Sequence, residues 1–397
     1  MSNILVLTYW SYNDALVQAY TLPYLKIIKN NLPVNSKIYL LTLERNNNQI
    51  NEKGDEQIQW VPFHYYSFGI LASFQWIRII ISLWCLIVFK KVSAIHCMGT
   101  PAGMIGYILS IFTGKKLIID SYEPHAESMV ENGTWKKNGL PYKILFLFEK
   151  LQTKRAFAVI AATASMKSYA LKKYNAALNK FYSKPACIDL DLFAFKYSKN
   201  KELLNKYNLN NDNIICVYAG KIGGIYLQEE IFDFFSVCCN YWKDKFRIIL
   251  LPNTISKSEI EIYLKQKKIP KDICIIESIE YEQMPVYLGL ADFALNPVKP
   301  VPSKQYCTSL KDGEYWAMGL PVVITKNISD DSSIIEENDI GAVLYNFDKE
   351  NYLAAVKKID AILNSPSLQK KKEEIRNIAK RFRGFEVAEK IYQEIYA

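Results

Sequence analysis

The sequence predicts two doubly wound α/β domains in tandem. The chain has 397 residues, which is too long for one compact core of ordinary size and suits two domains. Short apolar runs rich in Val and Ile alternate with longer helical runs, the pattern of a parallel sheet covered on both faces. The alternation weakens once and then starts again. We therefore expect domains at 1–185 and 213–379, a linker at 186–212, and a C-terminal helix at about 380–397 that packs back on the first domain.

The first half of the chain provides the first alternating series. The expected strands are Ile4–Thr8, Lys37–Thr42, Ile58–Pro62, Ala94–Cys97, Lys116–Asp120 and Ala158–Ala162. The expected helices between them are Leu16–Asn30, Leu71–Lys90, Pro101–Phe112 and Pro141–Ala156. Strands joined by helices of this length imply right-handed βαβ units in a parallel sheet.

A second series begins with "IICVYAGKIGG" at residue 214. It continues through "FRIILLPN", "DICIIES", "ADFALNPV", "PVVIT" and "GAVLYN", each followed by a turn or a helix. In open sheets of this kind, ligands bind beyond the carboxyl ends of the strands, where several loops converge. These loops are therefore where we expect the chemistry.

Composition limits the partners and the compartment. The net charge of +9 is a mild excess that suits acidic small molecules or an anionic membrane surface, and no nucleic-acid recognition motif is present. The eight cysteines form no C-x-x-C pair and several lie in apolar runs, which predicts buried free thiols in a reducing compartment. The sequence opens directly on a strand pattern, so we expect no cleavable signal peptide and a cytoplasmic protein.

Residues 68–91, "FGILASFQWIRIIISLWCLIVFKK", are nearly long enough to cross a bilayer. Gln75 and Arg78 near the middle favour a buried or membrane-facing helix over a span. The apolar helical segments and nearby lysine pairs would suit peripheral docking on the inner face of an anionic membrane. An ordinary buried core with a solvated basic face is the alternative. The lysine pairs are Lys90 with Lys91, Lys115 with Lys116, and Lys136 with Lys137.

Two loops carry groups that can bind anions or move protons. In "VYAGKIGG", Gly220 and Gly223 allow close backbone approach and Lys221 adds a positive charge, which predicts phosphate binding; a plain strand-to-helix turn is the alternative. In "LIIDSYEPHAESM", Glu123 and His125 follow a buried strand. The imidazole is a candidate proton donor or acceptor, or a hydrogen-bond donor to substrate, with a solvated surface loop as the alternative.

The stretch "CTSLKDGEYWAMGLPVV" places charged residues at the mouth of a buried strand. The carboxylate of Glu314 near a helix start is a local cap or, with a nucleotide bound, an acceptor for two ribose hydroxyls. The groups expected to face a diphosphate are the helix amides with Thr308, Ser309 and Lys311. The D-x-D pair of Asp189 and Asp191 lies in the expected linker, so we interpret it as structural rather than as a metal site.

"GEYWAMGLPVV" resembles the donor-site signature of retaining GT-B glycosyltransferases, especially family 4, with its Glu-x-x-Ala-x-Gly-x-Pro-Val-Val pattern. "KPACIDLDLF", "VYAGKIGG", "YEQMPVYLGLADFALNPV" and "DSYEPHAESM" are similar to other segments of that family and recur in its order. Two departures stand out. Tyr306 occupies the position of the family's first glutamate, and "TYWSYNDALVQAY" replaces the usual glycine-rich loop after the first strand.

The resemblance implies a GT-B fold with two Rossmann-like domains and a metal-independent transfer of a sugar, with retention, from a nucleotide diphosphate donor to a glycan or lipid-linked acceptor. No cofactor is implied. A sugar-nucleotide epimerase or hydrolase of the same shape, or a non-catalytic partner subunit, are the alternatives. The implied catalytic residues are His125, Lys221, Lys311 and Glu314. The implied donor-binding residues are Gly220, Lys221, Gly223, Thr308, Ser309, Lys311, Gly313 and Glu314, and those on the acceptor side are Asn13, Glu123 and His125.

Overall fold

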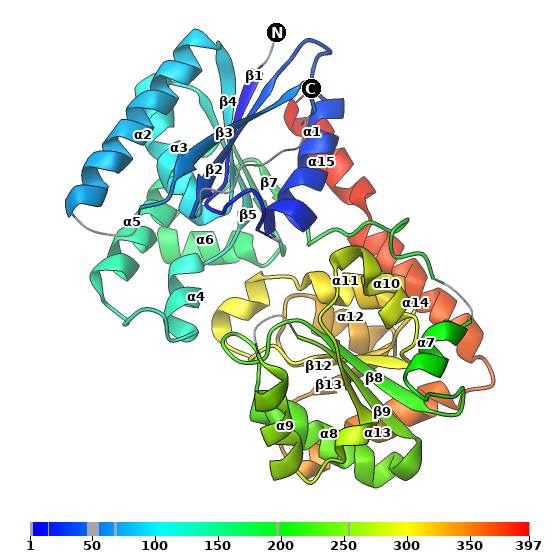
Figure 1. Cartoon of the computed structure of the whole chain (residues 1–397). Helices are drawn as coiled ribbons and strands as arrows, with labels where there is room; N and C mark the ends of the chain where they lie inside the picture. Colours follow the sequence, from blue (N-terminus) through cyan, green and yellow to red (C-terminus); the bar gives the residue numbers. More distant parts are fainter. Residues whose placement is uncertain are drawn as a thin grey trace. The chain divides into compact units, whose positions relative to one another are not determined.

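The computed structural model describes residues 3–14, 16–45, 55–66, 70–195, 198–252 and 255–396. The chain divides into two compact units (Figure 1). Unit 1 comprises Met1–Pro185 together with Glu386–Ala397, and unit 2 comprises Ala186–Phe385. Each unit has its own parallel sheet and its own buried apolar core.

Unit 1 is built on a seven-stranded sheet in the order β3-β2-β1-β4-β5-β6-β7, in which every neighbouring pair is parallel. The strand order reverses between β1 and β4, which is the place where doubly wound sheets bind ligands. The strands are β1 (Asn3–Leu7), β2 (Ile38–Glu44), β3 (Ile58–His64), β4 (Val92–Met98), β5 (Lys116–Tyr122), β6 (Ala158–Ala161) and β7 (Phe181–Ser183).

Helices cover the unit 1 sheet. Helix α3 begins with Pro101 in its first turn and ends at Gly114 in a left-handed conformation, two ordinary helix boundary signals. A side chain at Gly106 would overlap Cys97 Sγ, so this glycine lets α3 pack closely on β4. Among the described residues, no helix is both long and apolar enough to cross a membrane. The helices are α1 (Leu22–Asn30), α2 (Ile70–Phe89), α3 (Thr100–Thr113), α4 (His125–Glu131), α5 (Leu140–Arg155), α6 (Met166–Tyr174) and α15 (Phe385–Tyr396).

A buried polar network joins α15 to the unit 1 sheet. Asp120 Oδ2 accepts a hydrogen bond from Tyr392 OH (2.6 Å) and lies 3.2 Å from His96 Nε2, while Lys184 Nζ lies 3.1 Å from Asp120 Oδ1. The other ring nitrogen of His96 is hydrogen-bonded to Tyr396 OH (2.6 Å). Burial by itself would raise the pKa of Asp120, but the Lys184 charge and the hydrogen bonds hold that pKa below its usual range. Helix α15 therefore belongs to the core of unit 1, although it follows unit 2 in the sequence.

Unit 2 repeats the same topology with six parallel strands in the order β10-β9-β8-β11-β12-β13. Its strands are buried on both faces. In β8, for example, Val217 belongs to one apolar core, while Cys216 and Tyr218 belong to the core on the other face. The strands are β8 (Ile214–Ala219), β9 (Phe246–Leu251), β10 (Cys274–Ile276), β11 (Phe293–Asn296), β12 (Val322–Thr325) and β13 (Gly341–Leu344). The helices are α7 (Lys201–Lys206), α8 (Glu229–Trp242), α9 (Lys257–Gln266), α10 (Met284–Leu288), α11 (Leu310–Ala317), α12 (Asp331–Glu337), α13 (Lys349–Leu363) and α14 (Leu368–Arg383).

Residues 186–212, for which we expected a separate linker, belong to unit 2. Ile188 and Phe193 are buried in its core despite the polar residues around them. The amide of Ile188 donates to the carbonyl of Arg383 (2.8 Å), and the buried Arg383 guanidinium donates to the carbonyl of Ala186 (3.2 Å). Arg383 also forms an ion pair with Asp331. A few buried apolar side chains thus anchor residues 186–212 to unit 2, although the composition of this segment is that of a linker.

Candidate functional site

The carboxyl edge of the unit 2 sheet brings together the loop after β8, the loop after β11 and the start of α11. The first two loops are hydrogen-bonded to each other, because the amide of Leu227 donates to the carbonyl of Pro297 (2.8 Å) and the amide of Lys299 to the carbonyl of Ile225 (3.0 Å). β8 and β11 are the strands between which the order reverses. The three segments therefore meet at the switch point of this sheet.

Lys311 lies across Gly220. A side chain at Gly220 would overlap Lys311 Cε and place Cβ 2.9 Å from Nζ, and the φ of Gly220 is 124°, so only glycine fits here without strain. Lys311 Nζ donates to Tyr226 OH (2.8 Å) and stands 4.0 Å from the centre of the Tyr226 ring. The Lys311 ammonium group thus lies next to backbone at Gly220 that no side chain covers, an arrangement suited to binding an anion.

Glu314 follows Lys311 by three residues, so both side chains lie on the same side of α11. The residue is only 4% exposed, and Oε1 accepts a hydrogen bond from Tyr281 OH (2.9 Å). Burial raises the pKa of Glu314 to about 7, although the Tyr281 hydrogen bond and the Lys311 charge lower it. Burial and the neighbouring Glu314 in turn raise the pKa of Tyr281. Near neutral pH this carboxyl group can be either charged or neutral.

The rest of the glycine loop is a tight turn. Gly223 has a φ of 82°, and its carbonyl accepts from the amide of Tyr226 (3.1 Å). The Lys221 side chain is exposed, and its carbonyl accepts from Tyr218 OH. The structure therefore brings Gly220, Lys311 and Glu314 together, while it leaves the Lys221 side chain in solvent.

The remaining expected donor residues have distinct surroundings. Thr308 Oγ1 accepts from the amide of Ala186 (2.7 Å), so this hydroxyl already has a partner. Ser309 is the N-cap of α11 but makes no side-chain capping bond, which leaves amides of the first turn for another acceptor. At Gly313 a Cβ would lie 3.1 Å from Ile188 Cγ2, so this glycine serves the packing of α11 rather than facing the Gly220 loop.

Sequence reasoning missed the side chains that position these groups. Tyr226 and Tyr281 hold Lys311 and Glu314, and aromatic residues in loops carry no pattern that would reveal this. Asp312 is fully buried and accepts from Asn296 Nδ2 (2.7 Å), which ties the start of α11 to the end of β11. Burial and the nearby Asp331 carboxylate raise the pKa of Asp312 well above its usual range.

In unit 1, Glu123 and His125 follow the carboxyl end of β5. His125 Nδ1 and Glu123 Oε1 are hydrogen-bonded at 2.9 Å, and both side chains are partly exposed. This pairing favours the tautomer that carries the proton on Nδ1. Asn13, the third residue expected on this side, is exposed in the loop after β1.

A buried carboxyl group lies beneath the His125 turn. Glu149 of α5 accepts from the amide of Ala126 (2.9 Å) through Oε1 and from Tyr174 OH (2.8 Å) through Oε2. It thereby caps the first turn of α4, the helix that His125 begins. Burial raises the pKa of Glu149 to about 7, although both hydrogen bonds lower it. Sequence reasoning missed this residue because a glutamate inside a mixed helix is ordinarily on the surface.

The D-x-D pair has a local structural role. Asp189 Oδ1 accepts from the amides of Asp191 and Leu192, each at 2.9 Å. This is the side-chain-to-backbone turn that aspartate commonly makes. In the described ranges, no group of three or more His, Cys, Asp or Glu side chains is arranged to hold a metal ion.

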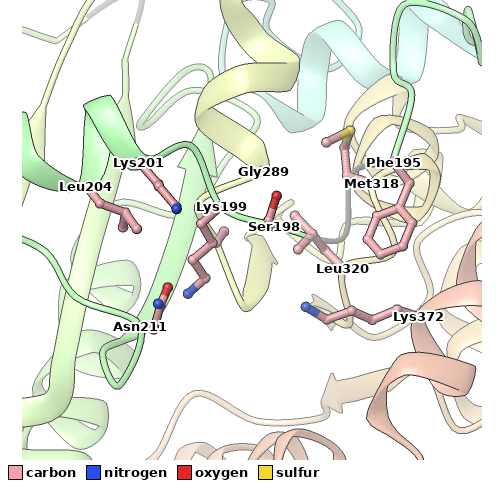
Figure 2. A pocket seen from close by; sticks show the side chains of 11 residues that line it. Phe195, Ser198, Lys199, Lys201, Leu204, Asn211, Gly289, Met318, Leu320 and Lys372 are labelled. Carbon is pink, nitrogen blue, oxygen red and sulfur yellow. The ribbon is translucent and has the colours of Figure 1, made fainter.

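A pocket of about 330 Å³ lies elsewhere in unit 2 (Figure 2). Lys199 and Lys372 approach it from opposite sides, and Lys199 pairs with Asp292 at 2.7 Å. Burial lowers the pKa of Lys372. Leu320 in its lining precedes β12, and Asp292 precedes β11, so the pocket lies at the amino edge of the sheet. The pocket is therefore at the opposite edge of the sheet from Gly220. The presence of a pocket does not mark the candidate site.

No protein-family model and no curated protein sequence matches the chain. Several solved structures match it over their full length. Sucrose-phosphate synthase from Thermosynechococcus elongatus has a TM-score of 0.79 at 14% identity, with 100% of this chain and 98% of that chain covered. Anabaena Alr3699/HepE in complex with UDP-glucose has a TM-score of 0.71 at 13% identity, covering 100% and 99%. WaaG, a glycosyltransferase involved in lipopolysaccharide biosynthesis, has a TM-score of 0.70 at 12% identity, covering 99% of each chain.

The chain has the GT-B fold. The predicted fold class of two Rossmann-like doubly wound units is thereby confirmed. At identities of 12–14% the likeness concerns the fold, so the chemistry has to be argued from the residues. Within a GT-B chain, the Gly220, Lys311 and Glu314 cluster lies at the switch point of the second sheet.

Proposed function

We propose that the protein is a glycosyltransferase that moves a sugar from a nucleoside diphosphate sugar to a glycan or lipid-linked acceptor with retention. The observation that carries the proposal is the placement of the Lys311 amine over Gly220, with Glu314 one helical turn further along α11. This combination offers a cation, an open backbone and a carboxylate in one place. A nucleoside diphosphate needs these three features for its phosphates and its ribose.

The donor would bind to unit 2. Its diphosphate contacts Lys311, the uncapped amides at the start of α11 and the Gly220 loop, and Lys221 swings in from solvent. Glu314 accepts hydrogen bonds from two neighbouring ribose hydroxyls and exchanges its present Tyr281 bond for them or shares it. Thr308 and Ser309 stand at the mouth of the same helix. Tyr226 keeps the lysine amine in place when the site is empty.

The rate enhancement would come from stabilising charge on the leaving diphosphate. Lysine ammonium groups and helix amides neutralise that charge, so the transfer needs no divalent metal. With retention, the new bond forms on the face of the sugar that the diphosphate leaves, and the leaving phosphate accepts the proton of the acceptor hydroxyl. His125, held by Glu123 through Nδ1, orients the substrate in this scheme rather than acting as a base. Asn13 is proposed on the same acceptor side.

The pathway is proposed from the chemistry and from the structural neighbours. WaaG is described as a lipopolysaccharide glycosyltransferase, and WaaB as a lipopolysaccharide outer core galactosyltransferase. HepE was solved with UDP and glucose and with UDP-glucose. We propose a uridine or related nucleotide sugar as the donor, assembly of a bacterial surface polysaccharide as the process, and the cytoplasm as the place where the donor is used.

A donor panel tests the proposal. Thermal shift and slow donor hydrolysis are measured with nucleotide sugars that differ in base and sugar. Lys311→Ala should weaken nucleotide binding about 10- to 100-fold, because a charge-assisted contact contributes about 1.5–3 kcal/mol. Lys265→Ala, an exposed lysine on α9, is the matched control and should bind like the parent. Equal affinity of the Lys311→Ala variant and the parent for every nucleotide would refute the assigned site.

Separate experimental results would test the metal requirement and identify each alternative function. Full activity in excess EDTA is expected; a loss that magnesium or manganese restores would contradict metal independence. Hydrolysis or isomerisation of the donor with no transfer to any acceptor would identify an epimerase or hydrolase. Unit 2 contains no histidine for such acid–base work, since the three histidines are at 64, 96 and 125. Binding of no nucleotide at all would identify a non-catalytic subunit.

A further inference from the structure

Helix α2 exposes a continuous apolar stripe. Successive members are separated by three or four residues, so they lie on one side of the helix. Each of them is between 43% and 67% exposed. The stripe consists of Phe74, Ile77, Ile81, Trp84 and Val88. Ile79, Leu83 and Ile87, on the opposite side, are buried against unit 1. One apolar side of α2 therefore builds the core, and the other faces outward, as its outer position in Figure 1 allows.

More apolar groups and lysines gather where α2 and α3 end. Phe89 is 79% exposed at the end of α2, and Phe112 is 70% exposed near the end of α3. Both helices lead into neighbouring parallel strands, β4 and β5, in which Ala94 is paired with Lys116. Their ends therefore lie close together at the amino edge of the sheet. This edge carries exposed Lys90, Lys91 and Lys116 and half-buried Lys115.

The basic character continues along the same edge. Lys116 Nζ and Lys180 Nζ lie 4.4 and 4.2 Å from the centre of the Phe157 ring, so β5, β6 and β7 each begin beside a positive charge. Helix α2 itself contains no acidic residue, and its one charged residue is Arg78. The pair Lys136 and Lys137 follows α4 at the other edge and is not counted in this surface.

We propose that the α2 stripe together with this basic edge, here called the α2 face, docks on an anionic lipid membrane. The helix would lie in the plane of the interface with the aromatic and aliphatic stripe in the acyl boundary, while the lysines contact acidic headgroups. Contiguous exposed apolar surface of this extent is rare unless it binds something. The charges decide between the candidate occupants. If the α2 face bound a second copy of the chain, Arg78 and the lysines would face the same positive charges on the partner, and α2 has no acidic residue to pair with them. An anionic leaflet complements all of these charges.

Vesicle flotation tests the docking directly and needs no nucleotide, so its failure is distinct from failure of the proposed function. The full-length protein is mixed with phosphatidylcholine vesicles with and without phosphatidylglycerol, at low and at high salt. We expect flotation only with phosphatidylglycerol, and less of it as salt rises, because exposed charges are screened. Equal recovery with both vesicles, or none with either at low salt, overturns the proposal.

Variants assign the effect to the α2 face. Ile81→Asp should abolish flotation, whereas Ile262→Asp, on α9 of unit 2, should float like the parent; the two isoleucines are 55% and 54% exposed, so the change in surface polarity is matched. Lys90→Gln with Lys91→Gln should reduce partitioning about five-fold per lysine, the equivalent of about 1 kcal/mol each. Parent-like melting temperatures establish that the variants fold. Unchanged flotation of Ile81→Asp overturns the assignment.

Two further readouts separate lipid from protein partners. Trp84 fluorescence, taken as the difference between the parent and Trp84→Phe, should be quenched by vesicles with brominated acyl chains, which requires the indole to reach the acyl region. Sedimentation equilibrium of the lipid-free protein should give a monomer. A dimer that Ile81→Asp dissociates, with no quenching of Trp84, would show that the face binds a second copy and would refute lipid docking.

Discussion

Because Gly220 has no side chain, the end of the Lys311 side chain can lie directly against the backbone at this position. Because a methyl group there would overlap the end of the Lys311 side chain, Gly220→Ala should push the amine away from Tyr226. We expect nucleotide affinity to fall at least about ten-fold, the loss of one charge-assisted contact, measured by titration calorimetry. Gly224→Ala is the control. It also has a positive φ, of 65°, but no atom lies within 4 Å of its would-be Cβ, so affinity should change less than about two-fold.

The Glu314 carboxyl group should make donor binding depend on pH. Its pKa is raised to about 7, so it is mostly neutral at pH 6 and mostly charged at pH 8. The charged form is the better acceptor for ribose hydroxyls, and affinity should therefore rise about ten-fold across this interval. The terminal phosphate of a free nucleoside diphosphate titrates near this range, whereas both phosphates of a nucleotide sugar are esterified and stay charged. The quantity to measure is thus the difference between the parent and Glu314→Gln, and parallel pH profiles of the two proteins would contradict the role.

At the scale of elements, the sequence was sufficient to predict a strand or helix wherever a short local pattern defines it. Except for the short β7, the strands of both sheets were predicted within a few residues, because runs such as "IICVYA" and "FRIILL" are apolar on both faces and bounded by turns. Residues 186–212 were misjudged because Ile188 and Phe193 are isolated apolar residues, whose burial depends on α14 nearly two hundred residues later. For the candidate site, motif and strand end coincide at Gly220, Lys311 and Glu314, which the structure brings together, while their role in donor binding stays a prediction. Tyr226, Tyr281 and Glu149 could not be predicted, because their roles arise only from tertiary contacts.

Helix α4 depends on the buried Glu149, and unit 1 should show this in its stability. The folded pKa of about 7 lies above the ordinary value of 4.5, so folding favours the neutral form. This contribution is fully present below pH 4.5 and is lost as pH rises through 7, on the order of 3 kcal/mol in total. The free energy of unfolding of Glu149→Gln relative to the parent should therefore increase between pH 5 and 8. Denaturant unfolding measures it, and a difference that stays constant between pH 5 and 8 would contradict the role assigned to Glu149.

At the scale of the whole molecule, unit 2 is inserted into unit 1, because unit 1 combines the first 185 residues with the last helix. Tyr392 on that helix is fully buried and donates to Asp120 (2.6 Å). Tyr392→Phe removes one donor from a buried carboxylate and should destabilise unit 1 by about 1–3 kcal/mol. Tyr345→Phe is the matched control, since Tyr345 donates to Glu336 (2.7 Å) from an exposed position in unit 2.

Removing the chain after Gly384 extends this prediction to the entire helix. Besides the Tyr392 bond, the truncation exposes Asp120, His96 and Lys184, and it removes the buried side chains of Ala388 and Ile391. The loss of the Tyr392 hydrogen bond and the loss of apolar burial both destabilise unit 1, so it should unfold or melt at a much lower temperature. Unit 2 keeps the ion pair of Arg383 with Asp331 and should retain its own melting transition. Differential scanning calorimetry resolves the two cases: we expect the truncated chain to lose one of the parent's transitions. If both transitions survived at their original temperatures, α15 would not be part of the core of unit 1, and the role assigned to the Asp120 network would be wrong.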